Sequence, residues 1–98
     1  MGGSQSRSRL AVRIYRIEVR PAAARALSKI DTPIARRIQG AIALLANDPH
    51  PPAARQLRGR PGLRVRVGDY RIIYMVVDDL LLVVVVTIGH RRNVYKVK

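Results

Sequence analysis

Residues 63–88, LRVRVGDYRIIYMVVDDLLLVVVVTI, are the stretch that decides the fold of this chain. Apolar and basic residues alternate from Leu63 to Val67, and this period of two is typical of a strand with one buried and one exposed face. Gly68-Asp69 favours a tight turn. The sequence therefore predicts that a second strand, over residues 70–77, forms a hairpin with the first.

The second half of the stretch predicts another strand behind another turn. Asp78-Asp79 is a pair that favours turns, and residues 80–88 follow it as an almost unbroken apolar run. Such a run is typical of a central strand that is covered on both faces. Residues 89–93 are then expected to form a loop. The sequence does not decide whether residues 94–97 form a short last strand.

The residues before this stretch predict one strand and two helices. Residues 12–19 alternate roughly with period two and are rich in β-branched residues, which indicates a strand. Pro21 suits the start of a helix over 22–29. Thr32 and Pro33 are expected at the N-cap and first position of a second helix, which runs to about residue 47. The predicted order is β-α-α-β-β-β, an α+β domain with a helical hairpin on one face of a mostly antiparallel sheet.

The length and composition fit one small domain. A chain of 98 residues that is 48% hydrophobic supports a single core. We assign this domain to residues 11–98 and expect residues 1–10, rich in Gly, Ser and Arg, to form a flexible arm. The chain has no Cys, which excludes disulfides and thiolate metal sites. No secretory signal is visible and the apolar run is too short to span a bilayer, so we expect a cytoplasmic protein with no membrane partner.

The charge of the chain indicates a polyanionic partner. Nineteen Lys and Arg stand against six Asp and Glu, and the net charge is +13. Most of the basic residues are Arg, whose planar guanidinium matches phosphate. Nucleic acid, a ribosomal surface, anionic lipid and an acidic protein all fit this charge. An ordinary Arg-rich surface that reflects codon usage is the alternative.

Several arginines are expected on one face of the sheet. The period of two places Arg64 and Arg66 together, opposite the helices. Arg71 follows in the adjacent strand, where a hairpin brings it beside that pair. Arg91 and Arg92 enter from the loop after the central strand, with Tyr95 close behind. These guanidiniums would repel one another unless a polyanion bound them; the alternative is a solvated face whose Arg stems cover apolar surface.

Familiar catalytic arrangements are missing from the sequence. It has no Ser/His/Asp set and no Gly-rich phosphate loop. Turn formation explains Asp78-Asp79 better than a metal site does, so we predict no metal ion and no cofactor. His50 lies between prolines and is expected to be an ordinary loop residue. His90, beside Arg91, is a candidate for proton transfer.

Three motifs carry a resemblance to a known family. They are Leu57-Arg-Gly, then LRVRVGDYRIIY over residues 63–74, then GHRRNVY over residues 89–95. Together they resemble the RelE toxins of bacterial toxin–antitoxin pairs, and the likeness extends from about residue 12 to the end of the chain. The resemblance implies a helical hairpin on a curved antiparallel sheet, which is the fold that the periodicity predicts.

The resemblance also implies an activity. RelE toxins enter the ribosomal A site and cut messenger RNA without a metal ion: the ribose 2′-OH attacks the adjacent phosphate and leaves a 2′,3′-cyclic phosphate and a 5′-OH. By position, Arg64 and Arg66 match two basic residues that line the active face, and Arg71 matches an arginine that contacts the scissile phosphate. Arg91 matches an arginine that steadies the transition state, and Tyr95 matches an aromatic residue near the C-terminus. Further RNA contacts are expected from the basic residues Arg58, Arg60, Arg92 and Lys96.

The chain departs from the family pattern at the two basic positions, which are Arg here and Lys there. A lysine can transfer a proton after its pKa falls, whereas an arginine effectively cannot. Our hypothesis is therefore that Arg64, Arg66, Arg71 and Arg91 act electrostatically. His90 and Tyr95 then remain as the proton-transfer side chains.

Two other functions remain open at this point. ParE toxins share the fold but inhibit DNA gyrase, and a non-catalytic member would only bind RNA or the ribosome. In every case the resemblance implies a cognate RelB-like antitoxin, with acidic residues that answer the charge of the toxin. Messenger RNA on the ribosome is the other expected partner.

Overall fold

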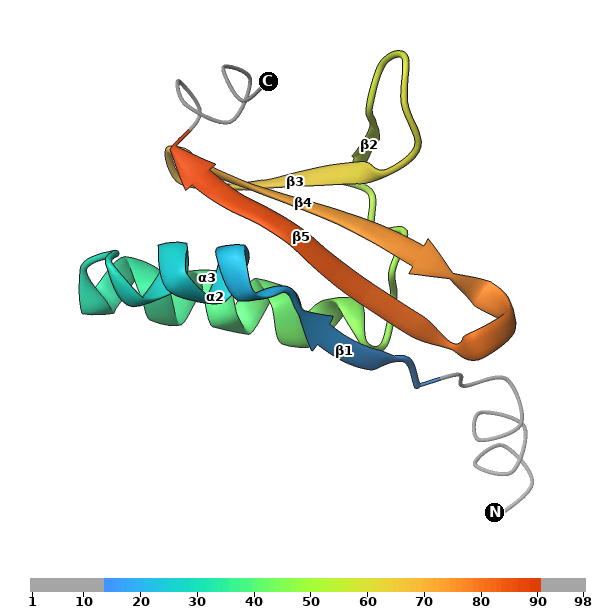
Figure 1. Cartoon of the computed structure of the whole chain (residues 1–98), viewed down its shortest axis with the longest axis horizontal. Coiled ribbons are helices and arrows are strands. Elements are labelled where there is room, and N and C mark those ends of the chain that lie inside the picture. Colours follow the sequence, from blue (N-terminus) through green and yellow to red (C-terminus); the bar gives the residue numbers. More distant parts are fainter. Residues whose placement is uncertain (1–13, 91–98) are drawn as a thin grey trace, which may run out of the picture.

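The computed structural model describes residues 14–90 of the chain (Figure 1). The flexible arm predicted over residues 1–10 lies outside the described residues, as do residues 94–97, for which the sequence does not decide on a last strand. The described part contains two α-helices, five strands and a short 3-10 turn. In chain order these are β1 (Arg16–Val19), α2 (Pro21–Ser28), α3 (Thr32–Leu45), β2 (Arg55–Gln56), β3 (Leu63–Val67), β4 (Tyr70–Val77), η1 (Asp78–Leu80) and β5 (Leu82–His90).

The strands form one sheet in the order β1-β5-β4-β3-β2. Strand β1 pairs with β5 in parallel, and every other neighbouring pair is antiparallel. The predicted α+β class and mostly antiparallel sheet are therefore confirmed. The two-residue strand β2 is an addition, because so short a segment leaves no alternation to recognise in the sequence.

The two helices lie on one side of the sheet, and the loop between β2 and β3 rises on the other side (Figure 1). Helix α3 presents Ile38, Ile42 and Leu45, which repeat at helical spacing and are buried. They pack in one core with strand residues such as Val65 and Ile72. Burying an aliphatic side chain of this size contributes about 1.5–3 kcal/mol, so the apolar face of α3 fixes which face of the sheet points inward.

The start of α3 differs from the prediction by one residue. The backbone N–H of Ala35 donates to the carbonyl of Asp31 at 2.8 Å, so Asp31 is the N-cap and Thr32 is already helical. The predicted N-cap at Thr32 is thus wrong. Thr32 and Pro33 lose no hydrogen bond at these positions, because the first backbone N–H groups of a helix have no acceptor within it.

The turn between β4 and β5 is longer than predicted. Residues Asp78–Leu80 form η1, and Leu81 follows in the left-handed region with φ 49°. Leu81 donates its N–H to the carbonyl of Asp78 at 3.1 Å, which closes the turn. Strand β5 consequently begins at Leu82, and the predicted start at Leu80 is wrong.

Strand β5 is central, because it lies between β1 and β4. Val83 and Val85 are buried against the helices, whereas Val84 between them keeps intermediate exposure on the other face. The predicted coverage of both faces is confirmed for one face only. The reason is that both helices lie on the same side of the sheet (Figure 1).

Two tyrosine hydroxyls connect distant segments to the sheet. Tyr74 is fully buried in β4 and donates to the carbonyl of Pro49 at 2.7 Å. Tyr15 donates to Oδ1 of Asp78 at 2.6 Å, which joins the residue before β1 to the turn η1. Buried hydroxyl groups need such partners, so these bonds fix the loop after α3 and the entry into β1.

Candidate nucleic-acid interface

Three arginines share the face of the sheet that points away from the helices. Arg66 pairs directly with Arg71 across β3 and β4, so their side chains lie on the same face. Arg64 precedes Arg66 by two positions in β3 and joins them. Their neighbours Val65 and Val67 are buried in the core. We call Arg64, Arg66 and Arg71 the Arg face, and the sequence prediction that brought them together is confirmed.

The three side chains differ in their surroundings. Arg66 is exposed, and Arg64 and Arg71 are half-buried. The Nε atom of Arg71 is buried, as expected for an arginine in the middle of the sheet. A partly buried guanidinium acts on a bound anion through a less aqueous surrounding than an exposed one does.

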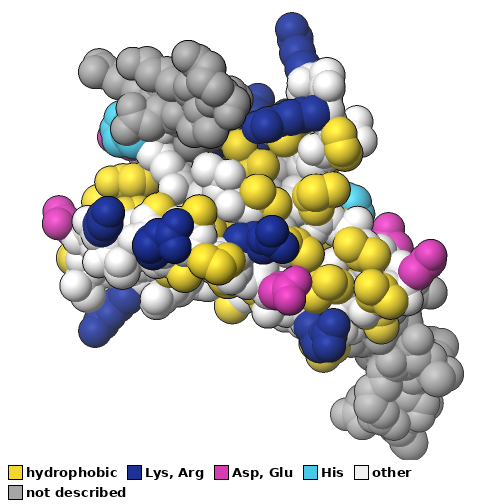
Figure 2. Space-filling model, in the orientation of Figure 1, with side chains coloured by type: hydrophobic (Ala, Val, Ile, Leu, Met, Phe, Trp, Pro, Cys, Tyr) yellow, Lys and Arg dark blue, Asp and Glu magenta, His cyan; other side chains and the backbone are white. Residues whose placement is uncertain are grey.

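The strands of the Arg face contribute no negative charge, and the acidic residue nearest in sequence to its three arginines is Asp69, in the turn between β3 and β4. Strands β2, β3, β4 and β5 contain no Asp and no Glu. Two of the acidic residues, Asp78 and Asp79, belong instead to η1, and Figure 2 shows acidic side chains at that end of the molecule. Like charges directly opposite one another on a sheet are destabilising, so a bound polyanion would relieve the repulsion on this face.

Sequence reasoning missed a further arginine on this face. Arg55 of β2 pairs directly with Arg64 of β3, so the two side chains lie on the same face. The next residue, Gln56, pairs with Leu63 on the core-facing side. The position of Arg55 on this face follows only from the pairing of β2 with β3. A strand of two residues shows no alternation from which that pairing could be predicted.

Arg58 and Arg60 lie in the loop between β2 and β3, and both are exposed. The loop turns at Gly59 and Gly62, which have φ of 72° and 122°, a region that suits glycine. Leu57 closes the loop by donating its N–H to the carbonyl of Gly62 at 3.0 Å. The loop rises on the same side of the sheet as the Arg face (Figure 1). The RNA contacts expected of Arg58 and Arg60 stay a prediction.

His90 lies on the opposite face from the Arg face. It pairs with Tyr70 at the end of β5, while Gly89 pairs with Arg71. The rings of His90 and Tyr70 meet edge to face, with centroids 5.6 Å apart. A β-bulge causes this placement: the register shifts between Ile73 and Tyr74, and a shift of one residue moves the later residues of β5 to the other face.

Four of the predicted site residues lie outside the described residues: Arg91, Arg92, Tyr95 and Lys96. Among residues 14–90 no group of three or more His, Cys, Asp or Glu side chains could hold a metal ion. No helix within those residues is long and apolar enough to cross a membrane.

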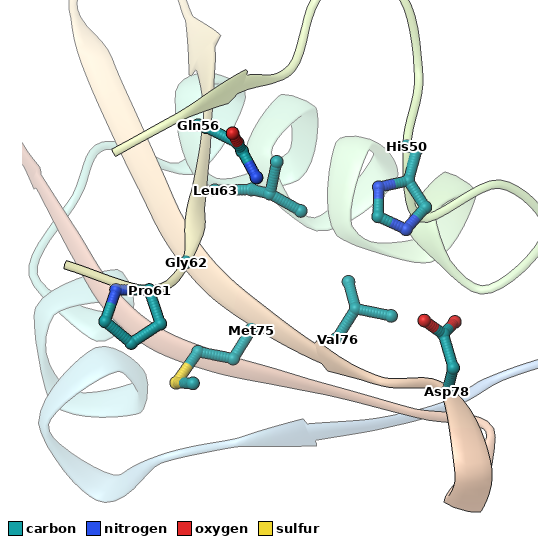
Figure 3. A pocket seen from close by; sticks show the side chains of 8 residues that line it. All are labelled: His50, Gln56, Pro61, Gly62, Leu63, Met75, Val76 and Asp78. Carbon is teal, nitrogen blue, oxygen red and sulfur yellow. The ribbon is translucent and has the colours of Figure 1, made fainter. Parts of the chain in front are cut away.

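A cavity of about 420 Å³ lies at the point where β4 continues beyond its pairing with β3. The side chains of His50 and Asp78 face each other across it (Figure 3). The full lining is His50, Gln56, Pro61, Gly62, Leu63, Met75, Val76 and Asp78. None of the predicted site residues within 14–90 lines this cavity, so for the described part of the chain the candidate site is the open sheet surface.

One ionisable group near this cavity has a shifted pKa. Burial raises the pKa of Tyr74 from 10.0 to about 12, and the negative charge of Asp48 adds to the shift. Tyr74 lies on the core side of β4, so its role is structural and separate from the Arg face.

A family model matches most of the chain. It describes the ParE toxin of the type II toxin–antitoxin system parDE, and it matches residues 17–95. A curated RelE-like toxin protein of Escherichia coli is 29% identical over 82 residues, which cover 81% of this chain and 85% of the relative.

Solved structures of RelE proteins share the fold. The RelBE2 toxin–antitoxin complex of Mycobacterium tuberculosis contains a chain that is 26% identical, with a TM-score of 0.71 over 81% of this chain and 93% of the other. The isolated RelE toxin of Escherichia coli is 23% identical, with a TM-score of 0.65 over 84% of this chain and 92% of the other. At that second level of identity the likeness concerns the fold alone.

Proposed function

We propose that this chain is a ribosome-dependent endonuclease that cuts messenger RNA in the A site. The chain belongs to the ParE toxin family of type II toxin–antitoxin systems, and it is a RelE-like toxin of that superfamily. The observation that carries the proposal is the Arg face. Arg66 lies directly opposite Arg71, with Arg64 on the same face, in strands that contain no carboxylate.

The chemistry that suits this face is transfer of a phosphodiester to the neighbouring ribose hydroxyl. The 2′-OH oxygen forms a bond to phosphorus, and the bond from phosphorus to the 5′-oxygen breaks. The products are a 2′,3′-cyclic phosphate and a 5′-OH. Negative charge grows on the phosphate oxygens in the transition state, and fixed guanidiniums stabilise that charge. In this proposal Arg64, Arg66, Arg71 and Arg91 have this electrostatic role, and the RNA on either side is held by Arg58, Arg60, Arg92 and Lys96.

A proton must leave the 2′-OH and another must reach the 5′-oxygen. Arginine stays protonated, so a different side chain is needed. His90 contacts Tyr70 on the opposite face of the sheet, which argues against direct contact with RNA. We therefore assign proton transfer to Tyr95, with His90 as the second candidate.

A site with so few acid–base groups needs help in aligning its substrate. In-line attack by the 2′-OH requires a defined RNA conformation, and fixing reacting groups in the right geometry lowers a barrier by several kcal/mol. The proposal assigns that alignment to the ribosome, which would hold the codon in the A site. Free RNA is then a poor substrate, and the reaction takes place in the cytoplasm without a metal ion or cofactor.

We further propose a cognate antitoxin as the protein partner. The related Mycobacterium tuberculosis protein was solved as a toxin–antitoxin complex. A net charge of +13 favours a partner with acidic residues, because complementary charge speeds and orients association. Such a partner would neutralise the Arg face and exclude RNA from it.

The test is a cell-free translation reaction with the purified chain, followed by primer extension on the message. We expect cuts within the A-site codon that vanish when ribosomes are omitted. Arg71→Gln and Arg66→Gln are expected to lower the cleavage rate by about 100-fold or more, since each removes charge from the transition state. Arg25→Gln, on the exposed surface of α2, is the matched control and should cleave normally.

The same assay separates the two proton-transfer candidates. Tyr95→Phe should abolish cleavage and His90→Ala should retain it. An intact message with normal translation would remove the endonuclease proposal altogether.

A second function has one observation in its favour, which is that the matching family model describes ParE toxins. ParE toxins inhibit DNA gyrase. If the message stays intact, a gyrase supercoiling assay with the same preparation decides between that activity and a protein that only binds RNA. Loss of supercoiling would establish the ParE-type activity.

A further inference from the structure

Strand β2 adds a fourth arginine to the Arg face, and no role for it follows from the family resemblance. We propose that Arg55 is a phosphate-binding subsite for RNA, which holds a phosphate next to the one that is cut. This inference rests on the proposed function for the identity of the RNA. The binding measurement described below tests it separately from cleavage.

The sheet register places Arg55 on the same face as the other three arginines. Arg55 pairs with Arg64, and Arg66 pairs with Arg71. From β2 to β4 there are two strand spacings, each about 4.8 Å. Arg55 and Arg71 also differ by two residues along the strands, because Arg55 is paired with Arg64 and Arg71 with Arg66. This offset suits an extended anion with several phosphates, such as a single strand of RNA, better than one phosphate group.

The guanidinium of Arg55 is already held in place. Its Nη1 atom donates to the carbonyl of Pro52 at 2.8 Å and to the carbonyl of Ala54 at 3.0 Å. A guanidinium has five N–H donors, and these bonds occupy the two on Nη1. The Nε and Nη2 donors remain as a planar pair, which is the arrangement that grips phosphate with two parallel bonds.

The fixed position lowers the cost of binding. An exposed arginine normally loses rotamer freedom when it contacts a ligand. In Arg55 part of that freedom is already lost, because two carbonyls of the preceding turn hold the group. Arg55 also stands opposite another cation with no carboxylate in the strands around it, so an anion there relieves repulsion as well.

The test is the salt dependence of RNA binding. A short fluorescein-labelled single-stranded RNA with 2′-O-methyl riboses, which cannot be cut, is titrated with the chain at several NaCl concentrations. The logarithm of affinity falls linearly with the logarithm of salt, with a slope of roughly 0.7 for each phosphate neutralised on a single strand. Arg55→Gln should make the slope shallower by about 0.7.

Two variants make the measurement specific. Arg25→Gln removes the same charge from α2, on the helical side of the sheet, and should leave the slope unchanged. Arg55→Lys keeps the charge but loses the two-donor fork, so it should keep the slope and bind less tightly. Circular dichroism melts should confirm that all three variants are folded.

Cleavage on the ribosome gives an independent readout. If Arg55 only holds a flanking phosphate, Arg55→Gln should raise KM several-fold and leave kcat unchanged, as expected when equal binding to substrate and transition state is lost. The proposal is overturned if Arg55→Gln binds RNA with the wild-type slope, or if Arg25→Gln changes the slope as much. A wild-type chain that binds RNA but never cuts it would defeat the proposed function and leave the slope test of Arg55 standing.

Discussion

Arg66 and Arg71 hold two positive charges directly opposite each other on neighbouring strands. Such a pair costs stability in the free protein, by an amount of the order of 0.2–1 kcal/mol relative to small neutral residues. In the proposed mechanism the same two charges stabilise the phosphate in its transition state. At this pair, the stability of the fold and the proposed activity therefore place opposite requirements on the sequence.

Neutralising one member of this pair should stabilise the fold. Arg66→Gln is expected to raise Tm at low salt by about 2–4 °C, because roughly 0.5 kcal/mol of repulsion is removed from a small domain. Calorimetry of the wild type and the variant in low and high NaCl measures the difference. The gain should shrink in high salt, where exposed charges are screened; a variant that melts at or below the wild-type temperature at low salt would contradict the prediction.

Elements are joined in this fold by a few buried polar groups as well as by apolar packing. The hydroxyl of Tyr74 in β4 binds the carbonyl of Pro49 in the loop after α3. Burial raises the pKa of Tyr74 to about 12, so the folded protein resists ionising this group. The neutral hydroxyl is the form that the fold stabilises.

Alkaline pH should therefore loosen the joint between β4 and this loop. A folded pKa above the ordinary value of 10.0 means that the contribution is complete below pH 10 and is lost as the pH rises towards 12. Tyr74→Phe should cost about 1 kcal/mol at neutral pH through the lost hydrogen bond. Urea unfolding as a function of pH should show a shallower alkaline decline in the variant than in the wild type, and parallel declines would exclude Tyr74 as the cause.

Much of this architecture was predictable, and the exceptions have local causes. Strands β3 and β4 follow from alternation and a turn pair, and the Arg face follows from the same period of two. Arg55 was missed because β2 is fixed by pairing with β3 and has no pattern of its own. The position of His90 was not predictable because one bulge near Tyr74 reverses the alternation of β5, and a bulge has no reliable sequence signal.

The whole molecule carries its charge unevenly. The net charge is +13, whereas η1 contributes Asp78 and Asp79 at one end of the sheet. The basic residues repel one another over distances longer than any single contact, which disfavours the compact state. Screening by salt and binding of multivalent anions weaken this repulsion without changing any packing.

Ionic strength should therefore raise the stability of the isolated chain. Tm is expected to increase by several degrees when NaCl goes from about 20 mM to about 200 mM, where the screening length falls below 10 Å. Under the proposed function short RNA binds the folded state, so it should produce a larger increase at low salt. Thermal melts followed by circular dichroism provide the measurement, and a Tm that stays constant across this range would show that the net charge has little effect.

The hydrogen bond between Tyr15 and Asp78 joins residues 63 positions apart, and the parallel pairing of β1 with β5 begins beside it. During synthesis β1 is made before β5, its partner strand. At roughly 5–20 residues per second, the delay between the two lasts several seconds. Until then the nascent chain has no closed sheet to support the Arg face. Under the proposed function, a nascent copy would leave the ribosome that makes it intact, and an antitoxin already in the cell would have time to bind the chain as it folds.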